Sequence, residues 1–270
     1  MGNSVFKSST NRTPRKTIPG GEGESRQLRL QLKLLADVGL LGLPNAGKST
    51  LISLISAANP KVADYPFTTL VPSLGVVRVA EEASFVIADI PGLIEGAAAG
   101  HGLGTQFLRH LSRTRVILHL VEVRPLDESS PLQNVELIER ELAEYSSAMS
   151  ERETWIVLTK IDELEDGEIE SLLQDFYSRF PSRRIFAISA MADLGLGELK
   201  KNVMSELALI DARLQDEEGY QDKIKDLEKR ISGDVLSRSN MERDAIAQVK
   251  EVDRLEEQAD GEPEVVYVKD

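Results

Sequence analysis

The sequence predicts an α/β fold: a wound, mostly parallel six-stranded sheet with helices on both faces. Short apolar runs alternate along the chain with segments of helical periodicity. The runs span residues 38–43, 75–79, 85–89, 116–121, 155–159 and 185–188, and the helical segments lie near residues 48–57, 104–112, 132–148, 168–179 and 195–209. Several runs are apolar at nearly every position, which is typical of strands covered on both faces.

Composition limits the class of protein. The chain has 270 residues, 41% hydrophobic and 29% charged, which is enough for one sizeable core and something beyond it. The sequence contains no cysteine, which excludes a disulfide scaffold and a thiolate metal site and agrees with a reducing compartment. No secretion signal is recognisable, and the apolar runs are too short to span a bilayer. We therefore expect a cytoplasmic monomer without a membrane span.

Charge divides the chain into three parts. Residues 1–34 carry a net charge of +5 and residues 211–270 a net charge of −8, within a total of −13. We expect a basic head and linker at 1–36, the α/β domain at 37–210 and an acidic extension at 211–270, partly helical or disordered. The extension is either solvated periphery or a partner-binding segment. Its apolar spacing predicts two amphipathic helices separated near Gly233, with apolar positions at Ile224, Leu227, Ile231, Ile246, Val249, Val252 and Leu255.

A phosphate-binding pattern follows the first apolar run. Residues 42–49 fit G-x-x-x-x-G-K-[ST], in which glycines let backbone N–H groups point inward. Lys48 adds positive charge for the β- and γ-phosphates, and the Ser49 hydroxyl can bind Mg²⁺. A glycine-rich turn kept for packing is the alternative. The expected nucleotide contacts are Gly42, Leu43, Pro44, Asn45, Ala46, Gly47, Lys48, Ser49 and Thr50.

Two further segments suit the γ-phosphate and its metal. In the loop after the first helix, Thr69 can give Mg²⁺ a second protein oxygen. After the third run, the Asp89 carboxylate lies near the water shell of Mg²⁺, and the Gly92 N–H can meet a γ-phosphate. The expected contacts are Phe67, Thr68, Thr69, Leu70 and Val71 in the first segment and Asp89, Ile90, Pro91 and Gly92 in the second.

The last two motifs suit a guanine base. Asp162 can accept hydrogen bonds from guanine N1–H and the 2-amino group, whereas adenine offers no such pair of donors. The backbone after the sixth run can hold the base O6. The expected contacts are Thr159, Lys160, Ile161 and Asp162 in the first motif and Ser189, Ala190 and Met191 in the second. Each motif alone occurs by chance, but five in order at strand ends predict a guanine-nucleotide switch that binds GTP and GDP.

The motifs together resemble the bacterial Obg GTPase family. The resemblance rests on residues 42–50, 64–70, 92–104 and 107–110, and it covers roughly residues 3–200. It implies a slow, Mg²⁺-dependent GTPase that holds its nucleotide loosely. It also implies a role in assembly of the large ribosomal subunit, with rRNA contacts, and in stress signalling through guanosine tetraphosphate.

Three features depart from that family. Most of its glycine-rich amino-terminal domain is missing before Asn11, as in a truncated or short form, which should weaken ribosome binding. Thr159 stands where Asn is usual, which should weaken one link between base loop and phosphate loop. Met191 replaces the usual Ala, a change that backbone recognition should tolerate.

The sequence says less about the residues that catalyse hydrolysis than about those that bind the nucleotide. Leu93 occupies the place where Ras-like enzymes carry a water-orienting glutamine, which predicts slow turnover with Lys48, Thr69 and Gly92 in supporting roles. Glu95 either positions water or is simply solvated. Asn45 corresponds to a position where related GTPases hold K⁺. Arg109 and Arg113 are interpreted as surface or sheet-packing residues rather than arginine fingers.

Two functions stay open at this stage. In one, loops around Thr69 and Gly92 order on GTP and relax on hydrolysis; in the other, the protein senses GDP or an alarmone and hydrolysis is incidental. Leu93 favours sensing, and the Ser49 and Thr69 pair favours turnover. Other residues are given structural roles: His101, His110 and His119 share no metal-ligand spacing, and Trp155 and Tyr65 are assigned to core and switch packing.

Overall fold

The computed structural model describes residues 6–13, 21, 23, 25–26, 36–57, 61–62, 73–90, 110–234, 236–237 and 241. The chain divides into two compact units, Met1–Leu32 and Lys33–Asp270. The described part of the first unit contains a turn in which the backbone N–H and C=O groups of Ser8 and Asn11 bond each other at 3.1 and 3.2 Å. The elements below belong to the second unit.

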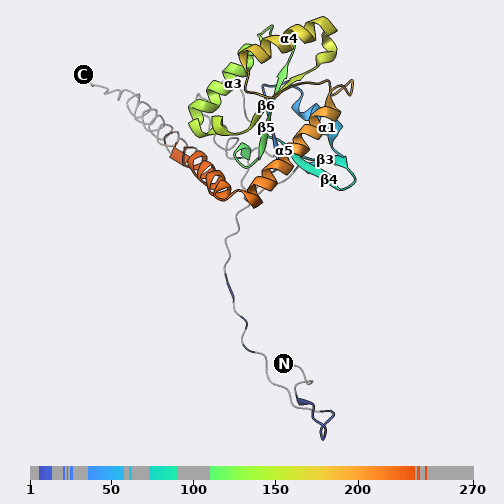
Figure 1. Cartoon of the computed structure of the whole chain (residues 1–270), viewed down its shortest axis with the longest axis vertical. Coiled ribbons are helices and arrows are strands. Elements are labelled where there is room, and N and C mark those ends of the chain that lie inside the picture. The colour runs from blue at the N-terminus through green and yellow to red at the C-terminus, as the bar shows by residue number, and fades with distance from the viewer. Residues whose placement is uncertain are drawn as a thin grey trace, which may run out of the picture. The chain divides into compact units, whose positions relative to one another are not determined.

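The described strands form one sheet in the order β2-β3-β4-β1-β5-β6-β7. Figure 1 labels β3, β4, β5 and β6 of this sheet. Neighbours from β4 to β7 are parallel, whereas β3 pairs antiparallel with β4 and with β2. The six expected strands are confirmed, and the two-residue β2 is additional. Their bounds are β1 Val38–Leu41, β2 Lys61–Val62, β3 Ser73–Ala80, β4 Ala83–Asp89, β5 Val116–Glu122, β6 Thr154–Thr159 and β7 Ile185–Ala187.

Helices cover both faces of this sheet. The α-helices are α1 Lys48–Ile55, α3 Pro131–Tyr145, α4 Asp166–Arg179 and α5 Leu196–Asp216, and the short 3-10 helices are η3 Ser147–Glu151 and η4 Ile161–Glu163. Buried side chains of α1 and α5 pack with one set of strand residues, and those of α3 and α4 pack with the other. The wound α/β architecture predicted from the alternating pattern is therefore present.

Alternation along the central strands explains why both faces are apolar. In β5, Leu118 and Leu120 join the cluster under α1 and α5, while Ile117 joins the cluster under α3. A strand with helices on both sides must be apolar at successive positions, because successive side chains point to opposite faces. Trp155 is fully buried on β6, which confirms its assignment to the core.

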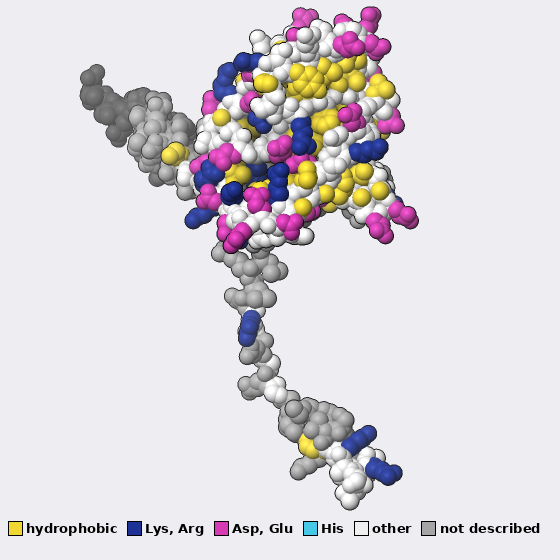
Figure 2. All heavy atoms as spheres, in the orientation of Figure 1, with side chains coloured by type: hydrophobic (Ala, Val, Ile, Leu, Met, Phe, Trp, Pro, Cys, Tyr) yellow, Lys and Arg dark blue, Asp and Glu magenta, His cyan; other side chains and the backbone are white. Residues whose placement is uncertain are grey.

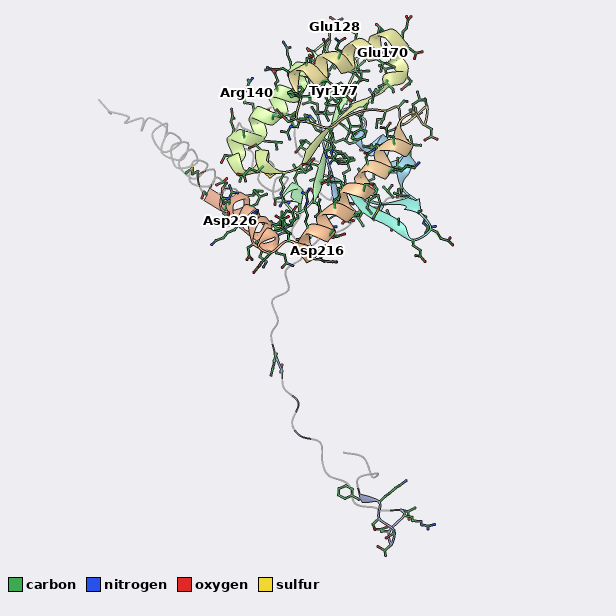
Figure 3. All side chains as sticks on the ribbon, in the orientation of Figure 1. Glu128, Arg140, Glu170, Tyr177, Asp216 and Asp226 are labelled. Atoms are coloured by element: carbon green, nitrogen blue, oxygen red, sulfur yellow. The ribbon has the colours of Figure 1, made fainter. Side chains whose placement is uncertain are left out.

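The described segment after α5, up to residue 234, packs onto the second unit. The expected boundary at residue 210 falls inside α5, which ends at Asp216, and residues 220–234 form a further helix. Figure 3 labels Asp216 at the end of α5 and Asp226 on the following helix. Leu227 and Ile231 of that helix are buried against the cluster that includes α3 and η3. No described helix has the length and apolarity needed to cross a membrane.

Gly233 itself does not break the helix. Residues 221–234 are helical without interruption, and Gly233 lies within that helix. A glycine in a helix costs about 1 kcal/mol relative to alanine, whereas burying one large apolar side chain contributes about 1.5–3 kcal/mol. Burial of Leu227 and Ile231 therefore outweighs the low helix propensity of Gly233. The second expected helix, around 246–255, lies outside the described residues.

Candidate nucleotide site

The phosphate loop connects β1 to α1 at the carboxyl edge of the sheet. Gly42 has φ +148°, and a Cβ there would lie 2.5 Å from the Leu120 carbonyl oxygen. Gly47 has φ +90° and precedes the first residue of α1, while Asn45 adopts a left-handed conformation with φ 66°. Glycine tolerates such conformations, so the loop can turn its N–H groups towards an anion at the helix start. The phosphate-loop pattern thus has the structural context that it requires.

Lys48 lies over this loop. Its Nζ donates hydrogen bonds to the carbonyl oxygens of Gly42 and Leu43, each at 2.9 Å. Burial lowers the pKa of the Lys48 ammonium, and the nearby Asp89 carboxylate partly opposes that effect. Lys48 therefore supplies a half-buried positive charge at the mouth of the loop, where a phosphate would bind.

Ser49 and Asp89 meet across the start of α1 and the end of β4. The Ser49 Oγ donates to Asp89 Oδ2 at 2.7 Å, although the residues lie 40 positions apart. The other carboxylate oxygen of Asp89, Oδ1, is buried and has no hydrogen-bond partner among the described residues. A hydroxyl and a carboxylate are the hard oxygen groups that Mg²⁺ and its bound water prefer. The residues present therefore fit a magnesium ion, which Ser49 would hold and Asp89 would reach through a water molecule.

The base-recognition loop is tied to the phosphate loop. The Thr159 hydroxyl lies 2.9 Å from the Ala46 carbonyl oxygen and 3.3 Å from that of Val121. Because Ala46 is in the phosphate loop, the link expected to weaken with threonine in place of asparagine is still made by one hydroxyl. The N–H of Ile161 donates to the Ile188 carbonyl at 3.3 Å, which joins the two predicted base loops.

The two predicted base loops differ in how free their polar groups are. Asp162 lies in η4, is exposed and makes no hydrogen bond to another described residue. Ser189 is buried; its Oγ accepts from the Ala192 N–H at 3.0 Å, and its own N–H donates to Leu194 O. Its N–H is therefore already engaged within the loop. Met191 is 78% exposed, so its side chain adds no packing to the loop.

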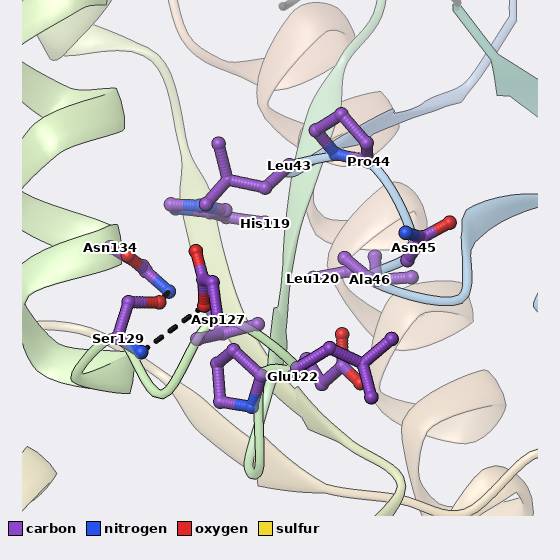
Figure 4. Close-up of a pocket in the computed structure, with 13 residues that line it drawn as sticks. Leu43, Pro44, Asn45, Ala46, His119, Leu120, Glu122, Asp127, Ser129 and Asn134 are labelled. Carbon is purple, nitrogen blue, oxygen red and sulfur yellow. Dashed lines mark hydrogen bonds between the residues drawn. The ribbon is translucent and has the colours of Figure 1, made fainter. Parts of the chain in front are cut away.

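A cavity of about 240 Å³ lies beside the phosphate loop (Figure 4). It is bounded by residues 43–46, by the end of β5 and by the loop that follows, where the Ser129 N–H donates to Asp127 Oδ1 at 3.1 Å. Neither Lys48, Ser49 nor the base-loop residues line it. The cavity therefore shares residues 43–46 with the expected nucleotide contacts but not the lysine, the metal-binding serine or the base loops.

His119 on β5 lines this cavity and is buried. Burial lowers the pKa of its imidazole to about 3, and the charges of Arg183 and Lys48 act in the same direction. The ring is therefore neutral at physiological pH. His110 follows the undescribed segment and is partly buried, and the described residues contain no group of three potential metal-ligating side chains.

Several predicted site residues lie outside the described residues. These are Phe67, Thr68, Thr69, Leu70 and Val71 of the first segment, Pro91, Gly92, Leu93 and Glu95 of the second, and Tyr65, His101 and Arg109. Their roles stay predictions. Arg113 is described. It is partly buried and lines a second cavity, whose lining includes no residue of the guanine motifs.

Glu122 was missed by the motif analysis. Its carboxylate forms an ion pair with the Nζ of Lys160, whose backbone is left-handed with φ 62°. The pair fixes the lysine of the guanine motif from the neighbouring strand. The signal was present in the sequence, since Glu122 is the first acidic residue after the apolar run 116–121 and so must stand at the carboxyl edge of the sheet.

Comparison with known proteins agrees with this geometry. Residues 37–160 match the family model described as 50S ribosome-binding GTPase, a little under half of the chain. The matched stretch contains the phosphate loop, Asp89 and the first two residues of the guanine motif.

Solved structures of GTPases are similar at low identity. The G domain of the T. maritima FeoB iron transporter has 20% identity and a TM-score of 0.43, over 63% of this chain and 97% of that chain. Era from Aquifex aeolicus has 22% identity and a TM-score of 0.46, over 64% of this chain and 57% of that one. A putative nucleolar GTP-binding protein 1 from Plasmodium falciparum has 19% identity and a TM-score of 0.48, over 69% of this chain and 94% of that chain.

Similarities of this size carry no inference about activity. The family match and the geometry of residues 42–49 and 89 converge on one conclusion. The chain contains a GTP-binding G domain of the P-loop GTPase type.

Proposed function

We propose that this protein is a cytoplasmic, magnesium-dependent GTPase of the Obg kind that hydrolyses GTP slowly and acts in assembly of the large ribosomal subunit and in growth or stress control. The observation that carries the proposal is the Ser49 to Asp89 hydrogen bond of 2.7 Å, with Asp89 Oδ1 buried and unpaired among the described residues. An acceptor left without a partner in a buried position costs about 1–3 kcal/mol. A water molecule held by a metal ion would satisfy it.

The ribosomal role draws on different support. The family model over residues 37–160 is described as a 50S ribosome-binding GTPase, and the motifs resemble those of the Obg family. The basic head offers positive charge to rRNA phosphates, and the acidic tail repels them. Binding to the large subunit by this chain should therefore be weak and strongly dependent on salt.

Magnesium would neutralise charge on the β- and γ-phosphates when bound. Ser49 would hold the ion and Asp89 would orient its water. Lys48 would move from the carbonyl groups of Gly42 and Leu43 towards the phosphate oxygens, since an anion attracts an ammonium more strongly than a neutral carbonyl does. Thr69 and the Gly92 N–H would complete the γ-phosphate contacts.

The metal role is tested by Ser49→Asn. The amide cannot replace the hydroxyl as a compact ligand, so Mg²⁺-dependent GTP binding should weaken more than GDP binding, because the ion bridges the β- and γ-phosphates. Titration of both nucleotides at several Mg²⁺ concentrations measures the difference. Ser205→Asn, at an exposed position on α5, is the matched control. Equal losses for GTP and GDP would contradict the assignment.

Turnover is tested by single-turnover GTP hydrolysis with and without large ribosomal subunits. Slow hydrolysis that rises with subunits supports the GTPase role, whereas nucleotide binding with no hydrolysis under either condition supports the sensor. Replacing K⁺ by Na⁺ should slow the reaction if Asn45 binds potassium. An unchanged rate would remove K⁺ from the proposal.

Subunit binding is measured by co-sedimentation at low and physiological salt with a non-hydrolysable GTP analogue. The expected result is a complex at low salt that dissociates as salt rises. A complex that resists high salt would contradict a purely electrostatic contact and place a specific docking surface on the G domain.

A further inference from the structure

A second cavity, of about 470 Å³, lies at the edge of the sheet away from the phosphate loop. The segments 113–115 and 151–153, which line it, precede β5 and β6. Both strands run parallel to the strands whose carboxyl ends carry the phosphate and guanine loops, so their amino ends lie at the opposite edge. The remaining walls come from α5 and the helix 220–234.

One side chain in this cavity is a buried cation with unused hydrogen-bonding capacity. Arg152 is only 7% exposed; its Nη1 and Nη2 donate to the carbonyl oxygens of Thr114 and Ser112 at 3.2 and 2.7 Å. Its Nε is buried and has no partner among the described residues. The carboxylate of Glu228 stands 3.9 Å from Nη2, beyond hydrogen-bond distance, and is 46% exposed. Burial lowers the pKa of the Arg152 guanidinium, with Glu228 partly offsetting it.

The other acidic side chains of the cavity are engaged elsewhere. Glu206 bonds Arg184 at 2.7 Å, Glu151 bonds Arg230 through both oxygens at 2.7 Å, and Glu153 accepts from Trp155 Nε1 at 2.8 Å. None of these three is hydrogen-bonded to Arg152. Figure 2 shows acidic and basic side chains intermingled where α5 meets the following helix. Four arginines and four glutamates line the cavity, so Arg152 is set apart by its buried Nε, which has no partner among the described residues, rather than by an excess of charge.

We propose that this cavity binds a small amphipathic anion, a carboxylate or similar group on an apolar body, with the anionic group at Arg152 Nε. Glu228 supplies an opposite charge at 3.9 Å, but no described acceptor is hydrogen-bonded to the buried Nε, and an anion would supply that acceptor. The apolar body would lie against Ile210, Leu214, Ile224 and Leu227, with Tyr220 beside it. The cavity volume is in the range of small-molecule sites.

Binding there would hold the helix 220–234 against the domain. The ligand would touch Tyr220, Ile224 and Leu227 on that helix, and Arg152 and Ile210 on the rest of the domain. A compound that bridges both parts in the folded state stabilises it by mass action. The site is independent of the guanine nucleotide, because none of its residues belongs to the phosphate or guanine motifs.

The test uses three probes on the full chain, titrated by calorimetry with and without GDP. 2-Naphthoate carries both the charge and the apolar body, 2-naphthol lacks the carboxylate, and inorganic phosphate lacks the apolar body. We expect 2-naphthoate to bind with a dissociation constant of about 1 mM or tighter, unaffected by GDP, and the other two at least tenfold more weakly. Equal binding of 2-naphthol overturns the anionic half of the proposal, and equal binding of phosphate overturns the apolar half.

Variants locate the site. Arg152→Met should weaken 2-naphthoate binding about tenfold or more, whereas Arg78→Met, an exposed arginine on β3, should leave it unchanged. Leu214→Trp fills the cavity from α5 and should abolish binding, and Leu209→Trp on the exposed side of the same helix is its control. If Arg152→Met does not fold, 2-naphthoate binding by Leu214→Trp and Arg152→Lys tests the location of the site instead. Absence of 2-naphthoate binding, or binding unaffected by the folded variants, refutes the proposal.

Discussion

Individual polar groups decide how the nucleotide loops are held together. Thr159, Ser49 and Lys48 each hydrogen-bond to a group on another segment of the chain or on the phosphate loop itself. Each bond joins partly or fully buried atoms, so its loss leaves a polar group without a partner. A substitution that removes one partner of such a bond is therefore expected to cost more than the bond itself contributes.

Thr159→Val should loosen nucleotide binding. Valine has nearly the shape of threonine but cannot donate to the Ala46 carbonyl, so the cost is an unpaired buried acceptor of about 1–2 kcal/mol. If that cost falls on the nucleotide-bound loop, GDP affinity drops about tenfold. Fluorescence titration with a labelled GDP measures it. Thr159→Ser keeps the hydroxyl and should bind like the parent; a Thr159→Val variant with unchanged affinity would show that this bond does not support the site.

Asp162→Asn should change the preferred base. Asp162 is exposed and makes no bond to another described residue, so its carboxylate is available to a ligand. An amide offers a donor to the 2-oxo group of xanthine where the carboxylate accepted from the 2-amino group of guanine. Competition between GTP and xanthosine triphosphate measures the shift. Asp166→Asn, at the start of α4, is the control, and a retained preference for GTP in the Asp162 variant would show that the motif is misplaced.

At the scale of elements, the helix 220–234 is an integral part of the second unit. Besides the buried Leu227 and Ile231, it is fixed by the Ser146 hydroxyl, which donates to Asp234 at 2.6 Å, and by the ion pair of Arg230 with Glu151. The ion pair is exposed and contributes little, because water screens it. The apolar contacts supply most of the attachment.

Ile231→Ala should therefore destabilise the protein by about 2–5 kcal/mol, the usual cost of truncating a fully buried isoleucine. Urea unfolding of the full chain gives the free energy. Leu236→Ala removes an exposed side chain two residues beyond that helix and should change stability by less than about 0.5 kcal/mol. Similar values for the two variants would mean that the helix is not packed as described.

At the scale of the whole molecule, His119 links folding stability to pH. The folded-state pKa of His119, about 3, lies below the ordinary value of 6.5. Between these two values the unfolded chain binds a proton at His119 and the native state does not. Its effect is absent above pH 6.5. As the pH falls from 6.5 towards 3, stability is lost at up to about 1.4 kcal/mol per pH unit.

Urea unfolding at pH 7, 6, 5 and 4 measures this slope. His119→Gln keeps a polar side chain that does not titrate, so its stability should fall less steeply below pH 6.5. Carboxylates contribute equally to both proteins, and the difference isolates the histidine. Parallel profiles for the two proteins would show that His119 accepts a proton in the folded state.

The sequence by itself determined the strand order along the chain, the wound α/β class and the phosphate loop. These depend on local patterns: continuous apolar runs form doubly covered strands, and glycines at Gly42 and Gly47 allow the backbone angles that the loop needs. The buried Trp155 also follows from its position within such a run. The short strand β2, which the sequence analysis did not predict, had no comparably strong local signal, and neither did the helix that continues through Gly233.

Only the tertiary structure decided which distant groups meet. The Lys160 pair with Glu122 depends on the register of β5 against β6, and the Ser49 bond to Asp89 depends on β4 lying beside β1. The unsatisfied Nε of Arg152 depends on how α5 and the helix 220–234 close over it. Burial and long-range register are properties of the packed chain, because they arise from desolvation by residues far away in sequence. A motif supplies the chemical groups, and packing determines which of them are left available for a ligand.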